Sequence, residues 1–308
     1  MTTATIIVGT RGSALALRQT QEVVERLQRV HSSLDLHVRV IRSSGDRRAN
    51  APLDVLGRGA FVQELEQALL RGEVDLVVHS LKDLPTEQPP GLVVAAVTER
   101  ADPRDALVDR WRLPLRELPP GVRIGSSSPR RAAQLLALRP DIQVPPIRGN
   151  VDTRLRKAVG PDYDGVVLAV AGLARAGLLE HVAEYLPLDV CLPAPGQGAL
   201  AVEARSGDSE LIALLRFIEH TPTRVAVEAE RGFLRALGGG CRVPVAAYAR
   251  LEGESLELTG MVSTESGREM HKASVRWSAR DPQGAGRELY RRLLEMGAGE
   301  MLGVKEQG

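Results

Sequence analysis

The segment Asp75-Leu76-Val77-Val78-His79-Ser80-Leu81-Lys82-Asp83-Leu84-Pro85 contains a short apolar run that is followed at once by polar residues. Leu76 to Val78 do not alternate with polar residues, which is typical of a strand buried on both faces of a parallel sheet. Ligands of open α/β sheets bind beyond the carboxyl ends of the strands, where Ser80, Lys82 and Asp83 lie. Taken alone, the segment is better explained as an ordinary strand–helix loop, with a capping Asp and a solvated Lys, than as a functional site. The rest of the chain changes this interpretation.

A strand–helix pattern precedes this segment. Thr5–Val8 predicts a strand, Ala14 to about Val30 a helix with apolar residues at helical spacing, and Leu36–Ile41 a second strand. Phe61–Leu70 predicts a helix that leads into the central strand. The order βαβαβ indicates a parallel sheet with right-handed crossovers.

The pattern returns further along the chain. Val122–Ser128 predicts a strand that ends in glycine and hydroxyl residues, and a helix follows from Arg130. The segment 164–173 aligns with 75–84, but alanine and glycine stand there in place of Lys82 and Asp83. We therefore expect two similar α/β lobes facing one another across a cleft, with the acid in one lobe only.

The remaining segments predict how the lobes are connected. Pro187–Gln197 is rich in Pro and Gly and is expected to cross between the lobes, and Ala199–Ala204 to return as a strand to the first. Thr221-Pro222 is a favourable helix start, and a small antiparallel α+β domain follows. The predicted fold class is α/β, with two lobes like those of periplasmic binding proteins and a small C-terminal domain. The predicted boundaries are 1–98 with 193–219 for lobe 1, 99–192 for lobe 2 and 220–308 for the third domain.

The composition is that of an ordinary soluble globular protein, with 308 residues, 43% hydrophobic and 26% charged residues. A net charge of +1 argues against wholesale nucleic-acid binding, and no apolar run approaches the ~20 residues that span a bilayer. The first residues lack a basic signal-peptide region, and two cysteines cannot form a disulfide framework. A cytoplasmic location is expected.

Arginine dominates the basic residues, because only Lys82, Lys157, Lys272 and Lys305 are lysines among 40. A GC-rich genome or adaptation to heat explains most of this excess, so position matters more than number. Six arginines fall at or soon after predicted strand ends: Arg11, Arg130, Arg131, Arg148, Arg154 and Arg175. A surface salt bridge is the alternative for each one. For Arg130-Arg131, beside serines at a helix start, we favour an anion site.

A glycine-rich loop carries one of the two cysteines, in Gly238-Gly239-Gly240-Cys241-Arg242-Val243-Pro244. The glycines let other atoms approach the backbone closely, so the thiol can be presented into a cleft. A small buried side chain beside a helix end is the alternative, and the local sequence leaves both open. Cys191 has no such setting and is expected in the core.

Several longer motifs occur in one order along essentially the whole chain. They are Thr10-Arg11 with Ser13, Val78 to Asp83, Ser127 to Arg131, Arg148 to Val151 with Thr153-Arg154, Leu192 to Gly198, Glu230 to Phe233, and Leu237 with Gly239 to Ala246. Together they resemble the porphobilinogen deaminase family, also called hydroxymethylbilane synthase.

The resemblance implies a transferase of heme and tetrapyrrole biosynthesis. It joins four porphobilinogen molecules head to tail, with loss of ammonia at each step, into hydroxymethylbilane. The chain is built on a dipyrromethane primer that a thioether holds to Cys241. The resemblance implies porphobilinogen as the small-molecule partner and a monomer, with no metal, nucleic acid or membrane involved.

The resemblance also implies roles for single residues. Asp83 is the catalytic residue, because loss of ammonia leaves an electron-poor azafulvene, and attack by the next ring gives a cationic pyrrole that a carboxylate stabilises. The acetate and propionate of every ring suit arginine. Cofactor binding is expected for Cys241, Lys82, Asp83, Ser128, Arg130, Arg131 and Arg154, and substrate binding for Arg11, Ser13, Gln19, Arg58, Arg148, Asn150, Arg175 and Gln197.

The loop before Phe61 departs from the family pattern. Relatives commonly carry two lysines there, whereas 53–59 is one residue shorter, Arg58 stands in place of the second lysine, and the first is absent. We therefore expect this loop to contact the growing chain with one basic residue fewer than in those relatives.

Two other classes of protein compete with this interpretation. A two-lobed binding protein for a small anion has the same first two lobes, but it leaves the third domain and the Cys241 loop unexplained. A hydrolase with a cysteine nucleophile needs a base, and none of the candidates, His79, His181 and His220, stands in a recognisable motif with Cys241.

Overall fold

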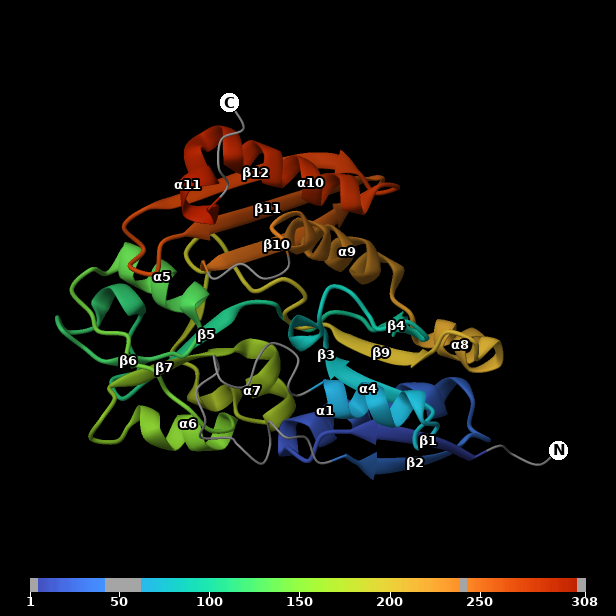
Figure 1. Ribbon diagram of the computed structural model, residues 1–308. Coiled ribbons are helices and arrows are strands. Elements are labelled where there is room, and N and C mark those ends of the chain that lie inside the picture. The colour runs from blue at the N-terminus through green and yellow to red at the C-terminus, as the bar shows by residue number, and fades with distance from the viewer. Residues whose placement is uncertain (1–4, 42–61, 239–242, 304–308) are drawn as a thin grey trace. The chain divides into compact units, whose positions relative to one another are not determined.

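A computed structural model describes residues 5–41, 62–238 and 243–303 (Figure 1). Arg58 and Cys241 therefore lie outside the described residues. The chain divides into two compact units, of which unit 1 comprises Met1–Ala101 with Gly198–Arg224, and unit 2 comprises Asp102–Gln197 with Val225–Gly308. No helix in the described part of the chain is long and apolar enough to cross a membrane.

Unit 1 contains a five-stranded mixed sheet with the order β2-β1-β3-β9-β4. Its strands are β1 (Thr5–Thr10), β2 (Asp35–Val40), β3 (Leu76–Ser80), β4 (Leu92–Val97) and β9 (Leu200–Arg205), and its helices are α1 (Ala14–Val30), α4 (Gln63–Leu70), α8 (Ser209–Leu215) and the 3-10 turns η1 (Leu81–Asp83) and η4 (Arg216–Ile218). The first three strands are parallel, as predicted. The predicted return of the chain as β9 is confirmed, but β9 runs antiparallel to both β3 and β4, so the sheet is mixed.

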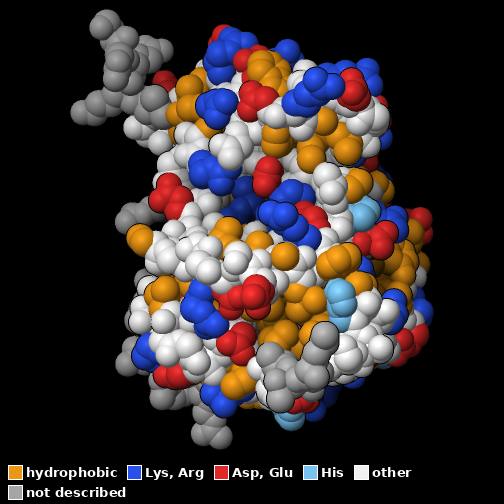
Figure 2. Space-filling view, turned by 90° about the vertical axis from the view of Figure 1, so that its right-hand side faces the viewer, with side chains coloured by type: hydrophobic (Ala, Val, Ile, Leu, Met, Phe, Trp, Pro, Cys, Tyr) orange, Lys and Arg blue, Asp and Glu red, His pale blue; other side chains and the backbone are white. Residues whose placement is uncertain are grey.

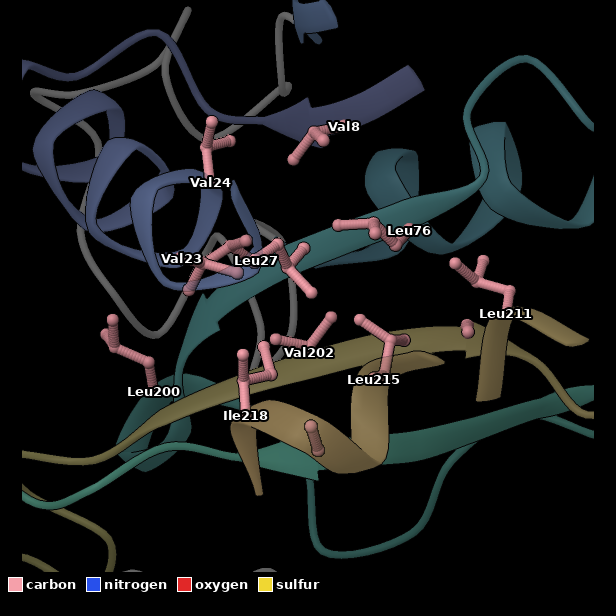
Figure 3. Packing of buried hydrophobic residues seen from close by; sticks show 13 residues of the cluster. Val8, Val23, Val24, Leu27, Leu76, Leu200, Val202, Leu211, Leu215 and Ile218 are labelled. Atoms are coloured by element: carbon pink, nitrogen blue, oxygen red, sulfur yellow. The ribbon is translucent and has the colours of Figure 1, made fainter. Parts of the chain in front are cut away.

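The central strand β3 is buried on both faces, as its unbroken apolar run predicted. Leu76 and Val78 pack with Val23 and Leu27 of α1 on one face. Figure 3 shows Leu76 and Leu27 in one cluster with Val8 of β1, Val202 of β9 and Leu215 of α8. Val77 packs on the other face, against α4. Successive side chains of a strand point to opposite faces, so each helix covers its own set.

Unit 2 contains a four-stranded mixed sheet with the order β6-β7-β5-β8. Its strands are β5 (Asp105–Asp109), β6 (Ile124–Gly125), β7 (Gly165–Ala169) and β8 (Glu184–Leu186), and its helices are α5 (Pro129–Leu138), α6 (Val151–Ala158), α7 (Val170–Ala176) and the 3-10 turns η2 (Leu115–Glu117) and η3 (Leu179–His181). β6 and β7 are parallel, whereas β5 is antiparallel to β7 and β8.

The internal similarity between the two α/β sheets is confirmed by matching hydrogen bonds. Asp75 precedes β3, and its carboxylate accepts a bond of 2.8 Å from the Ile7 N–H of the parallel neighbour β1. Asp164 precedes β7, and its carboxylate accepts a bond of 2.9 Å from the Arg123 N–H just before the parallel neighbour β6. The backbone N–H of each Asp donates in return to the same residue, at 2.8 Å in both cases.

The C-terminal part of the chain forms a three-stranded antiparallel sheet, β10 (Val245–Glu252), β11 (Ser255–Ser263) and β12 (Met270–Ser278). Its helices are α9 (Thr221–Ala236), α10 (Pro282–Leu293), the π-helical turn η5 (Leu294–Ala298) and α11 (Gly299–Leu302). Phe233 of α9 and Leu289 of α10 pack against one face of the sheet. Basic and acidic side chains are interspersed over this sheet at the top of Figure 2. The three sheets confirm the predicted fold class, two α/β lobes and a small C-terminal α+β domain.

Candidate active site

The predicted site residues of unit 1 lie at one edge of its sheet. β1 and β3 are parallel neighbours, so the loops that follow them leave the sheet at the same edge. The loop after β1 carries Arg11 and Ser13, and η1 after β3 carries Lys82 and Asp83. The two loops are connected through Gln19, whose amide donates a hydrogen bond of 2.7 Å to the Ser80 hydroxyl.

These residues differ in what their side chains do. The Ser13 hydroxyl caps the N-terminus of α1 by accepting from the Ala16 N–H at 3.2 Å. Gln19 is 7% exposed, and its amide donates a hydrogen bond to the Ser80 hydroxyl, so it stabilises the position of β3. Lys82 and Asp83 are exposed, and Arg11 is half-buried. Among the predicted site residues of unit 1 that the structure describes, the charged ones are therefore Arg11, Lys82 and Asp83, on the two loops.

In unit 2, three predicted site residues converge on one carboxylate that the sequence analysis did not single out. Asp105 is fully buried at the start of β5. It accepts a hydrogen bond of 2.7 Å from Arg130 Nη1, bonds of 3.1 and 2.7 Å from Arg131 Nε and Nη2, and a bond of 2.9 Å from Gln197 Nε2. The Cys191 thiol donates to it at 3.4 Å. We call these five residues the Asp105 cluster.

The register of the sheet explains this convergence. Asp105 on β5 pairs with Ala169, the last residue of β7, and β6 runs parallel to β7. The start of antiparallel β5 therefore lies at the edge where β6 and β7 end. The chain that leaves β6 enters α5 after Ser128, whose hydroxyl accepts from the Arg131 N–H at 3.4 Å. Arg130 and Arg131 thus begin a helix directly above the Asp105 carboxylate.

The electrostatics of the Asp105 cluster follow from its burial. Burial alone would raise the pKa of Asp105, but Arg130 and Arg131 hold it well below its usual range, so the carboxylate is ionised. Burial and the neighbouring Asp105 raise the pKa of the Cys191 thiol to about 12, so the thiol is neutral. The prediction that Cys191 belongs to the core is confirmed. Two guanidinium charges thus face one carboxylate charge.

Other predicted site residues of unit 2 lie on the segment 147–158 and on α7. The Asn150 side chain caps α6 by accepting from the Thr153 N–H at 2.9 Å, and Arg154 Nε donates to the Gly149 carbonyl at 2.8 Å. Arg148 and Arg175 are half-buried. The Ser127 hydroxyl donates to the Ile147 carbonyl at 2.7 Å and joins this segment to the loop after β6.

The predicted residues that the structure describes thus fall into two sets, one in each unit, and Arg58 and Cys241 are outside both sets because they are not described. Sequence reasoning missed Asp105 because no strand was predicted at 105–109, although an acid directly before the apolar Ala106-Leu107-Val108 was a usable signal. The described residues contain no group of three or more His, Cys, Asp or Glu that could hold a metal ion.

Comparison with known proteins gives two family matches in succession. Residues 6–213 match the dipyrromethane cofactor binding domain of porphobilinogen deaminase, and residues 225–295 match its C-terminal domain. The porphobilinogen deaminase of Desulforudis audaxviator is 50% identical over 298 residues, which cover 96% of each chain. That of Syntrophomonas wolfei is 47% identical and covers 96% of this chain and 97% of the relative. That of Roseiflexus sp. is 48% identical and covers 97% and 98%.

Among solved structures, the methionine-binding protein MetQ is similar with a TM-score of 0.44 and 11% identity, over 69% of this chain and 89% of the other. The aliphatic sulphonate binding protein SsuA from Escherichia coli has a TM-score of 0.39 and 14% identity, over 75% and 70%. The family matches span both units, and the predicted resemblance is confirmed. The chain belongs to the porphobilinogen deaminase family.

Proposed function

We propose that this chain joins four porphobilinogen molecules head to tail, with loss of ammonia at each step, into hydroxymethylbilane, on a dipyrromethane primer bound through Cys241. The observation that carries the proposal is the pair of family matches over residues 6–213 and 225–295, with relatives of nearly equal length at about 50% identity. A small-anion binding protein is not favoured, because it would leave the match of the C-terminal domain unexplained.

The donors of unit 2 fit an anionic cofactor. In the Asp105 cluster two guanidinium groups, each less than a tenth exposed, face one carboxylate and a neutral thiol, so the cluster has an excess positive charge. An excess positive charge at the first turn of α5 attracts carboxylates such as those of acetate and propionate groups. Arg131 already uses its three donor nitrogens on Asp105 and on the Val167 carbonyl, so it acts on a ligand through its charge.

We assign the cofactor to seven residues and the substrate to eight. Those for the cofactor are Cys241, Lys82, Asp83, Ser128, Arg130, Arg131 and Arg154. When bound, the dipyrromethane supplies the pyrrole carbon to which the first substrate unit is added. Those for the substrate are Arg11, Ser13, Gln19, Arg58, Arg148, Asn150, Arg175 and Gln197. Of these, Ser13, Gln19, Asn150 and Gln197 bond to neighbouring loops and helices, so we expect them to act by shaping the loops that carry the arginines.

Asp83 is the proposed catalytic residue. It is exposed at the end of η1, directly beyond the carboxyl end of the buried strand β3. Positive charge develops on the pyrrole nitrogen of the substrate when ammonia leaves and when the next bond forms. A carboxylate beside that nitrogen stabilises the charge and accepts or returns the proton. Lys82 supplies the positive charge that pairs with a ring carboxylate at the same turn.

We also propose the domain boundaries, the oligomeric state and the cellular location of the protein. Lobe 1 comprises 1–98 with 193–219, lobe 2 comprises 99–192, and the third domain comprises 220–308. The protein is a monomer in the cytoplasm. Limited proteolysis tests the boundaries, because linkers between domains are cut first. Sedimentation of the purified protein tests the monomer, and fractionation of the source cells tests the location.

The mass of the denatured, freshly purified protein tests the function. We expect an excess equal to two linked pyrrole units in the wild type and none in the Cys241→Ser variant. If the wild-type mass equals that of the bare chain, incubation with porphobilinogen distinguishes an apoenzyme from a binding protein, since only the former gains the adduct. A primer attached at Cys191 would overturn the assignment of Cys241.

The Asp83→Asn substitution tests the catalytic role. The exposed amide has nearly the shape of the carboxylate, so we expect the fold and the bound primer to be retained. Turnover should fall by about 10²–10⁴-fold, the usual contribution of a positioned acid–base group. Turnover within threefold of the wild type, with the primer present, would remove Asp83 from the mechanism.

A further inference from the structure

A second group of buried ionisable residues lies in unit 1, next to the turn that carries Lys82 and Asp83. His79, on β3, lies 3.2 Å from the Glu203 carboxylate of β9, measured from Nε2 to Oε2, with side chains 4% and 0% exposed. Glu66, on α4, is 6% exposed. The helix α4 packs against β1, β3 and β9. We call Glu66, His79 and Glu203 the buried triad.

The buried triad has more acceptors than donors. Oε1 of Glu66 and Oε1 of Glu203 are both buried and have no hydrogen-bond partner among the described residues. Buried carboxyl oxygens are normally paired, so both atoms require an explanation. If Glu66 and Glu203 were both ionised, two negative charges and several unsatisfied acceptors would lie in the interior. A proton on Glu66 removes one of these charges and supplies a donor.

The electrostatics also favour a protonated Glu66. Burial and the charge of Glu203 raise the pKa of Glu66, while His79 acts in the opposite direction. Three other charged residues lie on or next to the elements packed around the triad, namely Glu64 on α4, Asp75 directly before β3, and Arg205 at the end of β9. Asp75 and Arg205 pair with one another at 2.9 Å, at the end of β3 that is remote from His79. The Arg205 charge is thus already matched.

The location of the triad connects it to the reaction. Ser80 and His79 are the last two residues of β3, and their side chains point to opposite faces of the sheet. On one face Gln19 holds Ser80, at 2.7 Å, and on the other Glu203 holds His79. The turn begins at the next residue, Leu81, whose N–H donates to the Ala199 carbonyl on the chain that enters β9. The end of β3 is therefore fixed from both sides just before Lys82 and Asp83.

We propose that Glu66 carries a proton within the buried triad and that this proton positions the turn that carries Lys82 and Asp83. This inference rests on the proposed function, in which Asp83 acts on the substrate. Loss of the proton puts a second negative charge beside Glu203, and the strain between the two carboxylates displaces His79 and the turn after it. Glu66 and His79 are positioning residues, because they act through Asp83.

The first test measures the turn itself, without substrate. Amide hydrogen exchange of Leu81 and Leu84 in the wild-type holoenzyme is compared at pH 6 and pH 9, after correction for the intrinsic exchange rate. We expect protection to fall at least tenfold at pH 9 in the wild type and less than threefold in Glu66→Gln, which cannot ionise. Protection in the wild type that does not depend on pH would overturn the proposal, even if the variant failed to fold.

The second test measures turnover against pH. In Glu66→Gln the alkaline decrease of kcat should move upward by more than one pH unit, with KM changed less than twofold at pH 7. Glu219→Gln is the matched control, because Glu219 is also a partly buried acid of unit 1, where it accepts from the Val97 N–H at 2.7 Å and pairs with Arg224 at 2.8 Å and not with a residue of the buried triad. Its profile should coincide with that of the wild type. Identical profiles for all three proteins would refute the positioning role, whereas a wild type that makes no tetrapyrrole would refute only the proposed function.

Discussion

Replacing Asp105 by Asn tests the account of the Asp105 cluster. The carboxylate accepts hydrogen bonds from Arg130, Arg131 and Gln197 and is fully buried. An amide keeps one acceptor oxygen but directs its N–H groups at guanidinium N–H groups and removes the negative charge. Breaking a buried ion pair by removing one partner costs about 3–5 kcal/mol. Since one carboxylate serves two arginines here, we expect the upper half of that range.

The assay follows the unit that carries the substitution. Trp111 and Trp277 are the two tryptophans of the chain, and both belong to unit 2, so intrinsic fluorescence during urea unfolding reports on that unit. In a thermal scan, a loss of about 4–5 kcal/mol lowers the Tm by roughly 8–20 °C for a unit of this size. Asp102→Asn is the matched control. Its pair with Arg104 is partly exposed and is worth about 0–1 kcal/mol.

The stability difference between the wild type and Asp105→Asn should also depend on pH. The folded pKa of Asp105 is below that in the unfolded chain, about 3.9, so its stabilisation is fully present above that value and is lost as the pH falls. The difference between wild type and Asp105→Asn should therefore narrow below about pH 4. A variant within about 1 kcal/mol of the wild type at pH 7 would refute the reasoning, because it would mean that the two guanidinium groups do not depend on this carboxylate.

Two further predictions concern Glu66 and Cys191. The folded pKa of Glu66 is raised, so its favourable contribution is fully present below the unfolded value and is lost as the pH rises through the folded value. Glu66→Gln should therefore lose less unfolding free energy than the wild type between pH 5 and pH 8 in urea titrations; an equal loss would contradict this. The Cys191 thiol, buried and with a pKa raised to about 12, should resist iodoacetamide at pH 8 in the folded protein and react after denaturation, as peptide mass mapping shows; rapid native labelling would contradict its burial.

Much of the fold could be predicted because local signals were strong. The helix expected from Ala14 to Val30 has those bounds, since Ser13 caps it and its apolar face is periodic. The helix that begins at Thr221-Pro222 is also confirmed. In contrast, β5 begins and ends with aspartates, Asp105 and Asp109, which resemble a loop in sequence although both are buried.

The site could be predicted only in its residue types. The motifs identified Arg130 and Arg131, but no sequence pattern reveals that a distant Asp105 binds both, because this contact depends on the antiparallel register of β5 and β7. The same limit applies to the buried triad. His79 was visible as a candidate base, whereas its partner Glu203 lies 124 positions further along the chain and reaches it only when β9 pairs with β3.

The position of β9 has a consequence for how the protein is made. The sheet of unit 1 receives β9 between β3 and β4, although Leu200–Arg205 follows β4 by about a third of the chain. During translation at about 5–20 residues per second, the ribosome needs roughly 5–20 s to proceed from β4 to β9. Throughout that interval β3 and β4 lack their common neighbour and expose unpaired edges. The nascent polypeptide is therefore most prone to aggregation and to chaperone binding in this interval. A chain that is truncated before Leu200 lacks β9 and cannot form the complete five-stranded sheet of unit 1.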